Sequence, residues 1–221
     1  MAAQSLSSVP PHDQPAASHP LDPKIECESP TAHPRSIWIS ARLLSGAITF
    51  FFGAFVFAYF YLQALDVNHR WRIGPVHPSQ GLGLAIAALY LVGAIDYRLS
   101  VKRSGLDELT AGILAVLMGL AAVALQFLEY TTLDFGAASG GYAAVFYGWT
   151  ALYAIVALLG IYWIETQVAT LWRMRRPDGP RQVLMPQDEE TLLRAQVEAS
   201  SFYWAYFAAI GVLAYFLLYF I

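Results

Sequence analysis

Four carboxylates stand beside long uncharged runs in this 221-residue chain. They are Asp96, Glu129, Glu165 and Glu198. Acidic side chains at membrane depth either carry protons, as in pumps and transporters, or form hydrogen bonds that tie helices together. The residues around each carboxylate indicate which of these two chemistries to expect.

Glu129 belongs to a small polar group. It follows Gln126 by three residues and directly precedes Tyr130. Residues three and four apart share one helix face, so the three side chains lie together. We expect an interhelical polar clasp here, with proton transfer as the alternative.

The other three carboxylates have different surroundings. Glu165 lies eight residues before Arg173, about 12 Å along a helix axis, which makes it the most membrane-embedded acid of the four. We expect it to have a functional role or to bind a neighbouring helix. Glu198 follows Arg194 by four residues, the spacing of a helical salt bridge. Asp96, close to a helix end, is expected to be an interfacial charge.

Membrane helices must position these side chains. The chain is 57% hydrophobic and 13% charged, whereas soluble domains carry about 25% charged residues. A run of about 20 apolar residues can cross a bilayer. Five uncharged runs approach or exceed this length, at 43–65, 78–95, 109–128, 135–164 and 199–221. We therefore predict an all-α fold, a polytopic bundle of five transmembrane helices.

Basic residues predict the orientation of the bundle, because basic loops resist translocation. Of the 13 Lys and Arg residues, only Arg70 and Arg72 lie on the side away from the N-terminus. We expect a cytoplasmic N-terminus, or its organellar equivalent, and an external C-terminus. The proline-rich residues 1–36 are expected to form a disordered cytoplasmic tail, followed by a membrane domain at 37–221.

Several function classes lack the residues that they need. Haem and copper centres inside a membrane require side-chain ligands, normally histidine, but no predicted span contains His or Cys. We therefore expect no metal in this chain. None of the 12 prolines breaks a span, which disfavours the discontinuous helices of many transporters. A net charge of −3 disfavours nucleic acid as a partner.

Small residues indicate where helices pack closely. One face of the third span contains Ala111, Ala115, Gly119 and Ala122, and the first span has Gly46 and Gly53 seven residues apart. The last helix is expected to run without a break from Gln187 to Ile221, about 52 Å at 1.5 Å per residue.

The motifs of the last three spans occur in a recognisable order. Their residues are Gln126, Glu129 and Tyr130, then Gly148, Trp149 and Leu152, then Glu198, Ala199, Phe202, Tyr203 and Trp204. In this order and spacing they resemble subunit III of the heme-copper oxidases, best known from cytochrome c oxidase. The resemblance covers about residues 40–220. The five predicted spans are similar to the short five-helix bacterial form of the subunit, which implies a location in the inner (plasma) membrane of the cell.

The resemblance implies an accessory, non-catalytic subunit of a respiratory terminal oxidase. Such a subunit stabilises catalytic subunit I, which holds the haems and copper, is expected to associate with subunit II, and binds structural phospholipid. The implied lipid or subunit contacts are Arg194, Glu198, Tyr203 and Trp204. The implied helix clasp or subunit contacts are Gln126, Glu129, Tyr130 and Glu165.

Some positions depart from the family pattern. Ile48, or Ala47 in another alignment, occupies the place of a glutamate in the family's first shared span, and Thr150 and Tyr153 stand where histidines are common. These changes favour a scaffold role over a proton-related one. The alternatives are a subunit III homologue of a quinol oxidase or nitric oxide reductase, a small membrane transporter, and a membrane assembly factor.

Overall fold

The computed structural model describes residues 32–66, 69–74, 76–101, 106–175 and 187–221. Every regular element in these ranges is a helix. The elements are α1 (Ala32–Ala64), α2 (Gln80–Val101), α3 (Leu106–Thr132), α4 (Gly141–Arg175), α5 (Gln187–Tyr215) and a short π-helix, η2 (Phe216–Phe220). Five of the described helices are long and apolar enough to cross a membrane, which confirms the predicted all-α, multi-pass bundle.

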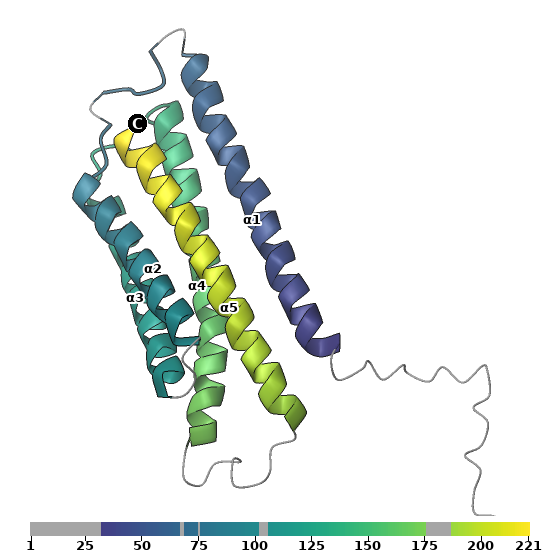
Figure 1. The fold of residues 1–221 in the computed structure, drawn as a ribbon. Helices are drawn as coiled ribbons and strands as arrows, with labels where there is room; N and C mark the ends of the chain where they lie inside the picture. Colours follow the sequence, from purple (N-terminus) through teal and green to yellow (C-terminus); the bar gives the residue numbers. More distant parts are fainter. Residues whose placement is uncertain (1–31, 67–68, 75, 102–105, 176–186) are drawn as a thin grey trace, which may run out of the picture.

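α5 connects the parts of the bundle. It contacts α1, α2 and α4, while α2 also packs on α3 and α3 on α4. Figure 1 shows α2 and α3 on one side of α5 and α1 on the other. The start of α1 and the end of η2 lie at opposite ends of the bundle, called here the N-terminal end and the C-terminal end (Figure 1).

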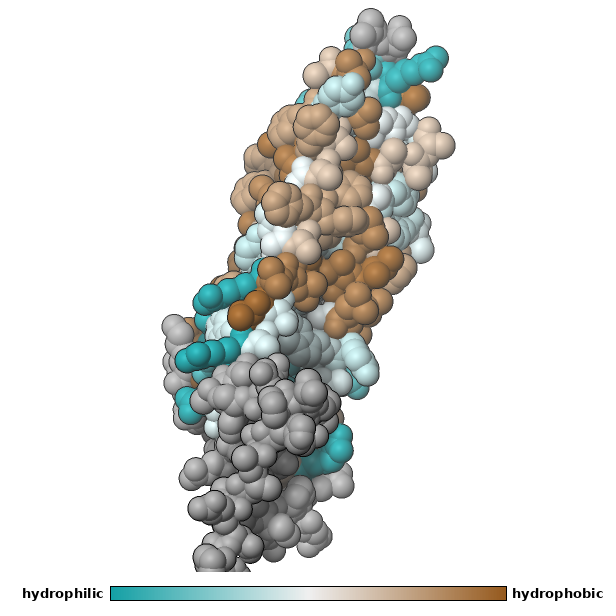
Figure 2. Space-filling model, turned by 90° about the vertical axis from the view of Figure 1, so that its right-hand side faces the viewer, coloured by the Kyte–Doolittle hydropathy of each residue, from teal (hydrophilic) through white to brown (hydrophobic). Residues whose placement is uncertain are grey.

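The outer surface is apolar over most of its length. Figure 2 shows hydrophobic residues covering the middle of one face, with hydrophilic residues gathered toward its ends. α1 is the least covered helix, and Phe50 on its outer face is 85% exposed. This distribution suits a bundle surrounded by lipid or by other membrane helices, because acyl chains are as apolar as these side chains.

The small residues of the third span lie where they were expected. Ala111, Ala115 and Ala122 are buried in α3, and a Cβ at Gly119 would meet the Ile161 side chain at 2.9 Å. Gly46 and Gly53 differ from the expectation, since no atom lies within 4 Å of a Cβ built at either position. Close packing therefore uses the small-residue face of α3 and does not use the glycines of α1.

The connection between α1 and α2 is fastened to the start of α4. The first two N–H groups of α4, on Gly141 and Tyr142, donate to the carbonyl oxygens of Arg70 (3.2 Å) and Trp71 (3.0 Å). These bonds satisfy donors that a helix start leaves without partners. Gly140 makes the approach possible: its φ is +115°, and a Cβ there would lie 2.6 Å from the Arg70 oxygen.

Two helix boundaries differ from the predictions. α1 begins at Ala32, so the last residues assigned to the tail are helical; Pro34 stands in the first turn, where a missing N–H costs no hydrogen bond. Residues 1–31 lie outside the described part of the chain. The last helix does not stay α-helical to Ile221, because it becomes a π-helix at Phe216, with the Ile221 N–H donating to the Phe216 carbonyl at 3.2 Å.

Candidate functional site

Glu129 is the centre of a polar group at the C-terminal end of the bundle. Its side chain is completely buried. The Oε2 atom accepts hydrogen bonds from Gln126 Nε2 on the same helix (2.8 Å) and from the Tyr219 hydroxyl in η2 (2.7 Å). The structure therefore brings Gln126 and Glu129 together and adds a partner from the last turn of the chain.

Tyr130 joins α3 to a different helix. Its hydroxyl donates to Thr150 Oγ1 on α4 at 2.7 Å. Thr150 in turn donates to the Phe146 carbonyl of its own helix at 2.7 Å. Tyr130 and Glu129 are thus adjacent in the sequence but fasten α3 to two separate neighbours.

A third tyrosine holds the end of the chain in place. The hydroxyl of Tyr142, in the first turn of α4, donates to the Leu218 carbonyl of η2. We call the group formed by Gln126, Glu129, Tyr142 and Tyr219 the C-terminal clasp. It joins α3, α4 and η2.

The chemistry of the C-terminal clasp follows from the two oxygens of Glu129. Oε2 has two donors, whereas Oε1 has no hydrogen-bond partner among the described residues. A buried carboxyl group can hold a proton on such an oxygen at lower cost than it can hold a charge. The arrangement therefore suits a structural tie and is also compatible with proton storage.

A second polar group lies between α2, α4 and α5, nearer the N-terminal end. The Gln167 Oε1 atom accepts from Ser200 Oγ (2.7 Å) and from the Tyr97 hydroxyl (3.1 Å), and its Nε2 donates to the Gln196 carbonyl at 3.3 Å. All three side chains that meet here are buried. This group was not predicted from the sequence; the available signal was a glutamine close to Glu165 in the second half of α4.

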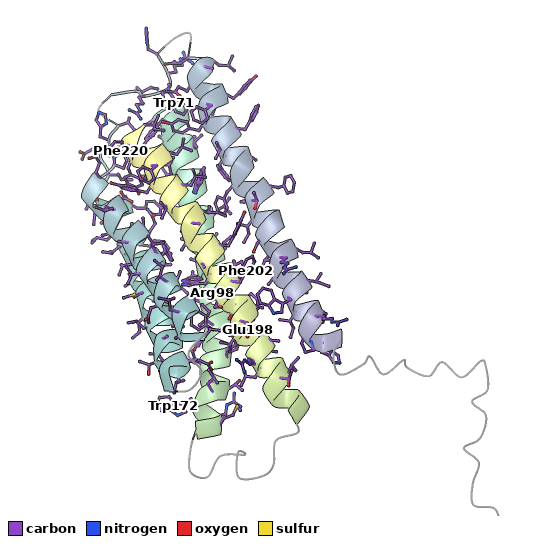
Figure 3. The ribbon with its side chains drawn as sticks, in the orientation of Figure 1. Trp71, Arg98, Trp172, Glu198, Phe202 and Phe220 are labelled. Carbon is purple, nitrogen blue, oxygen red and sulfur yellow. The ribbon has the colours of Figure 1, made fainter. Side chains whose placement is uncertain are left out.

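Arg98 lies beside this second group. Its guanidinium donates to Ser201 Oγ at 2.9 Å and to the Glu198 carbonyl at 3.4 Å. Figure 3 shows Arg98 reaching from α2 toward α5, next to Glu198. The cation is therefore held by α5 backbone and hydroxyl oxygens, so the α2–α5 contact includes a charge-assisted link.

Arg194 and Glu198 lie on the surface near the N-terminal end. Arg194 Nε is 3.6 Å from Glu198 Oε1 in the expected (i, i+4) salt bridge. Both line a groove of about 540 Å³ between α1 and α5, together with Arg35, Trp38 and Arg42. Arg42 Cζ stands 5.5 Å from the centre of the Trp38 ring. The groove combines cationic and aromatic side chains.

Glu165 does not join the C-terminal clasp. Its side chain is exposed on the outer face of α4, next to the exposed Tyr162 and Thr166. Asp96 is also exposed, on α2. Of the two roles expected for Glu165, a contact with a partner outside this chain fits its position, and a tie between helices of this chain does not.

Tyr203 and Trp204 lie inside the bundle. They are 3% and 1% exposed, and both rings approach Gly160 of α4, where a Cβ would meet them at 3.1 and 3.0 Å. This burial differs from the expected contact with lipid or a partner subunit. Their aromatic rings pack helices of this chain against one another, whereas Arg194 and Glu198 of the same predicted set lie on the surface.

The described residues contain no group of three or more His, Cys, Asp or Glu side chains placed to hold a metal ion. His69 and His77 are exposed in the connection between α1 and α2. Comparison with protein-family models and with curated proteins finds no match for this chain.

Replacing Gln167 with leucine is expected to lower the free energy of unfolding by only about 1 kcal/mol, within the range of single hydrogen bonds between membrane helices. The effect is small because Tyr97 and Ser200 keep their own hydrogen bond of 3.0 Å. Thermal unfolding in detergent measures it. Thr166→Leu is the matched control, since the Thr166 hydroxyl donates to the Trp163 carbonyl of its own helix at 2.7 Å and bonds no other helix in the described part of the chain. Equal effects of the two changes would contradict the prediction.

Proposed function

We propose that this chain is an accessory, non-catalytic subunit of a heme-copper terminal oxidase of the cytochrome c oxidase type. The observation that carries the proposal is the combination of Gln126, Glu129 and Tyr130 with Glu198, Tyr203 and Trp204, in the order found in subunit III. In the folded chain most of these side chains pack or bond helices to one another. A scaffold protein needs that kind of rigidity.

The proposed partner is the catalytic subunit, which would hold the haems and copper, together with subunit II. We assign the contact with a partner to the α4 face around Glu165. A carboxylate exposed toward apolar surroundings is costly unless another group pairs with it. The described residues offer no hydrogen bond or ion pair to Glu165, so a donor from a partner helix would satisfy it.

The proposal also gives the groove between α1 and α5 a phospholipid. Arg35, Arg42 and Arg194 outnumber Glu198 there, and basic pockets between membrane helices suit anionic headgroups. The lipid would fill the space between α1 and α5 and so stabilise the contact between these two helices. A lipid bound there would make the N-terminal end of the bundle more rigid, as a scaffold role requires.

Gentle purification through a tag on this chain tests the proposal. We expect stoichiometric haem in the optical spectrum and a large polytopic partner identified by mass spectrometry. The haem type and the partner set distinguish a cytochrome c oxidase from a quinol oxidase or a nitric oxide reductase. A colourless chain that is purified alone with native lipid retained would contradict the proposal and favour a transporter or an assembly factor.

Two variants at one position sharpen this test. Glu165→Leu removes the polar group and is expected to reduce the co-purified partner several-fold, whereas Glu165→Gln keeps a hydrogen-bonding side chain and is expected to retain more of it. Tyr162→Leu, one turn away on the same exposed face, is the control. Equal yields of partner with all three variants would remove Glu165 from the interface.

A further inference from the structure

Arg72 is an unusual cation at the C-terminal end of the bundle. It is half-buried, and no carboxylate pairs with it in the described part of the chain. Its Nε atom is buried there without a hydrogen-bond partner of normal geometry, and the neighbouring Tyr59 hydroxyl is buried without one as well. Because a buried charge is costly unless it is paired, this side chain is suited to bind an anion from outside the chain.

The backbone that precedes Arg72 fixes where this residue stands. The preceding carbonyls, on Arg70 and Trp71, cap the start of α4, and the Asp66 Oδ1 atom accepts from the N–H groups of the same two residues at 2.6 and 3.1 Å. The guanidinium carbon lies 4.5 Å from the centre of the Tyr142 ring. Stacking on an aromatic face orients a planar guanidinium and leaves its edge available for hydrogen bonds.

A cavity opens beside this side chain. It has a volume of about 390 Å³ and is lined by Arg72, His77, Gln80 and residues of η2. Gln80 is held in place because its Nε2 donates to the Tyr219 carbonyl at 3.2 Å. Three side chains that can donate hydrogen bonds thus face one space of the size that small ligands occupy.

Part of the cavity lining is apolar. Leu218 and Phe220 of η2 contribute to it, and Figure 3 shows Phe220 at the same end of the bundle as Trp71. The cavity lies where α2 begins and η2 ends, and the ends of membrane-spanning helices are where phospholipid headgroups are expected. An amphiphile with an anionic head matches a lining that combines a cation with apolar side chains.

We propose that Arg72, His77 and Gln80 bind a phosphate group. Arginine matches phosphate oxygens with two parallel N–H donors, which gives charge-assisted hydrogen bonds. The group can arrive as the headgroup of a phospholipid or as free phosphate from solution. This inference stands apart from the proposed oxidase function, since it uses neither Glu165 nor the groove between α1 and α5.

The test uses the full chain purified in a detergent with an uncharged head. Native mass spectrometry measures binding of phosphatidylglycerol and of diacylglycerol, which has acyl chains but no phosphate. Equilibrium dialysis measures binding of inorganic phosphate. We expect phosphatidylglycerol to bind and diacylglycerol to bind at least about tenfold more weakly, because the charge-assisted bonds are lost.

Arg72→Gln is expected to weaken the phosphate-bearing ligand about tenfold or more. Arg70→Gln is the matched control, because Arg70 is an exposed arginine of the same loop whose bonds are made by its backbone, and it should change affinity less than about twofold. Arg72→Lys keeps the positive charge but lacks the two parallel N–H donors of the guanidinium, and should give an intermediate loss of affinity. If Arg72→Gln does not fold, the affinity of Arg72→Lys for the phosphate-bearing ligand tests the proposal in its place.

The outcomes separate the two sources of phosphate. Binding of phosphatidylglycerol that Arg72→Gln weakens, with no binding of inorganic phosphate, supports a lipid headgroup. Binding of inorganic phosphate with the same sensitivity supports a free anion. Equal effects of Arg70→Gln and the Arg72 variants, equal binding of diacylglycerol, or no binding of either phosphate probe would overturn the proposal.

Discussion

Trp204→Ala is expected to destabilise the bundle by about 3 kcal/mol, at the lower end of the cost of removing a buried tryptophan. The ring fills the space left by Gly119 of α3 and Gly160 of α4, where a Cβ would meet it at 3.1 and 3.0 Å. Neither neighbour has a side chain that could move into the cavity. The lower end of the range applies because, in lipid, the loss comes from packing contacts rather than from exclusion of water.

Unfolding of the purified chain by a denaturing detergent measures this effect. Trp172→Ala is the matched control, since Trp172 is 50% exposed near the N-terminal end of the bundle (Figure 3), and it should cost less than about 1 kcal/mol. Trp204→Phe should fall between the two. A Trp204→Ala variant as stable as the Trp172→Ala variant would show that the α3–α4–α5 contact does not depend on this ring.

Glu129→Ala is expected to lower the free energy of unfolding by about 2 kcal/mol. The change removes the acceptor of two hydrogen bonds and leaves the Gln126 amide and the Tyr219 hydroxyl without it. Buried donors left in this way cost about 1–3 kcal/mol in proteins, and measured values between membrane helices lie toward the lower end. Tyr219→Phe, which removes the bond to η2 alone, should cost about 1 kcal/mol.

Glu129→Gln distinguishes the two chemistries considered for this carboxyl group. An amide oxygen still accepts from Tyr219, so a structural tie predicts stability close to that of the unchanged chain. Proton transfer predicts the opposite pattern, with Gln as damaging as Ala to any proton-coupled activity of the assembled complex. Unchanged stability in Glu129→Ala would argue against the tie.

The spans could be predicted from the sequence because a charged side chain in a bilayer costs free energy. A stretch of about 20 residues without charge is therefore easy to recognise. The tie between Gln126 and Glu129 could be predicted as well, since both lie on one helix at a fixed spacing. The bond to Tyr219 could not. It joins residues 90 apart and depends on the path of the chain through η2.

The burial of Tyr203 and Trp204 was not predictable for a related reason. In water, an apolar stripe on a helix marks the face that packs inward. Membrane helices are apolar all round, so α4 and α5 carry no such stripe, and an aromatic residue facing a neighbouring helix looks the same in sequence as one facing lipid. The hydrogen bonds of Gln167 were not predictable either, because a single glutamine in a sequence does not indicate that Tyr97 and Ser200 will donate to it.

The cap on α4 has a consequence for how the protein is made. The carbonyls of Arg70 and Trp71 that complete the start of α4 belong to a loop that leaves the ribosome well before α4 does. When α4 enters the membrane, the acceptors for its first two N–H groups are therefore already synthesised, and Gly140 lets the later segment settle against the earlier one. Synthesis in the natural order thus supplies these two donors with their acceptors, and a chain begun at α4 would have to insert that helix without acceptors for its first two N–H groups.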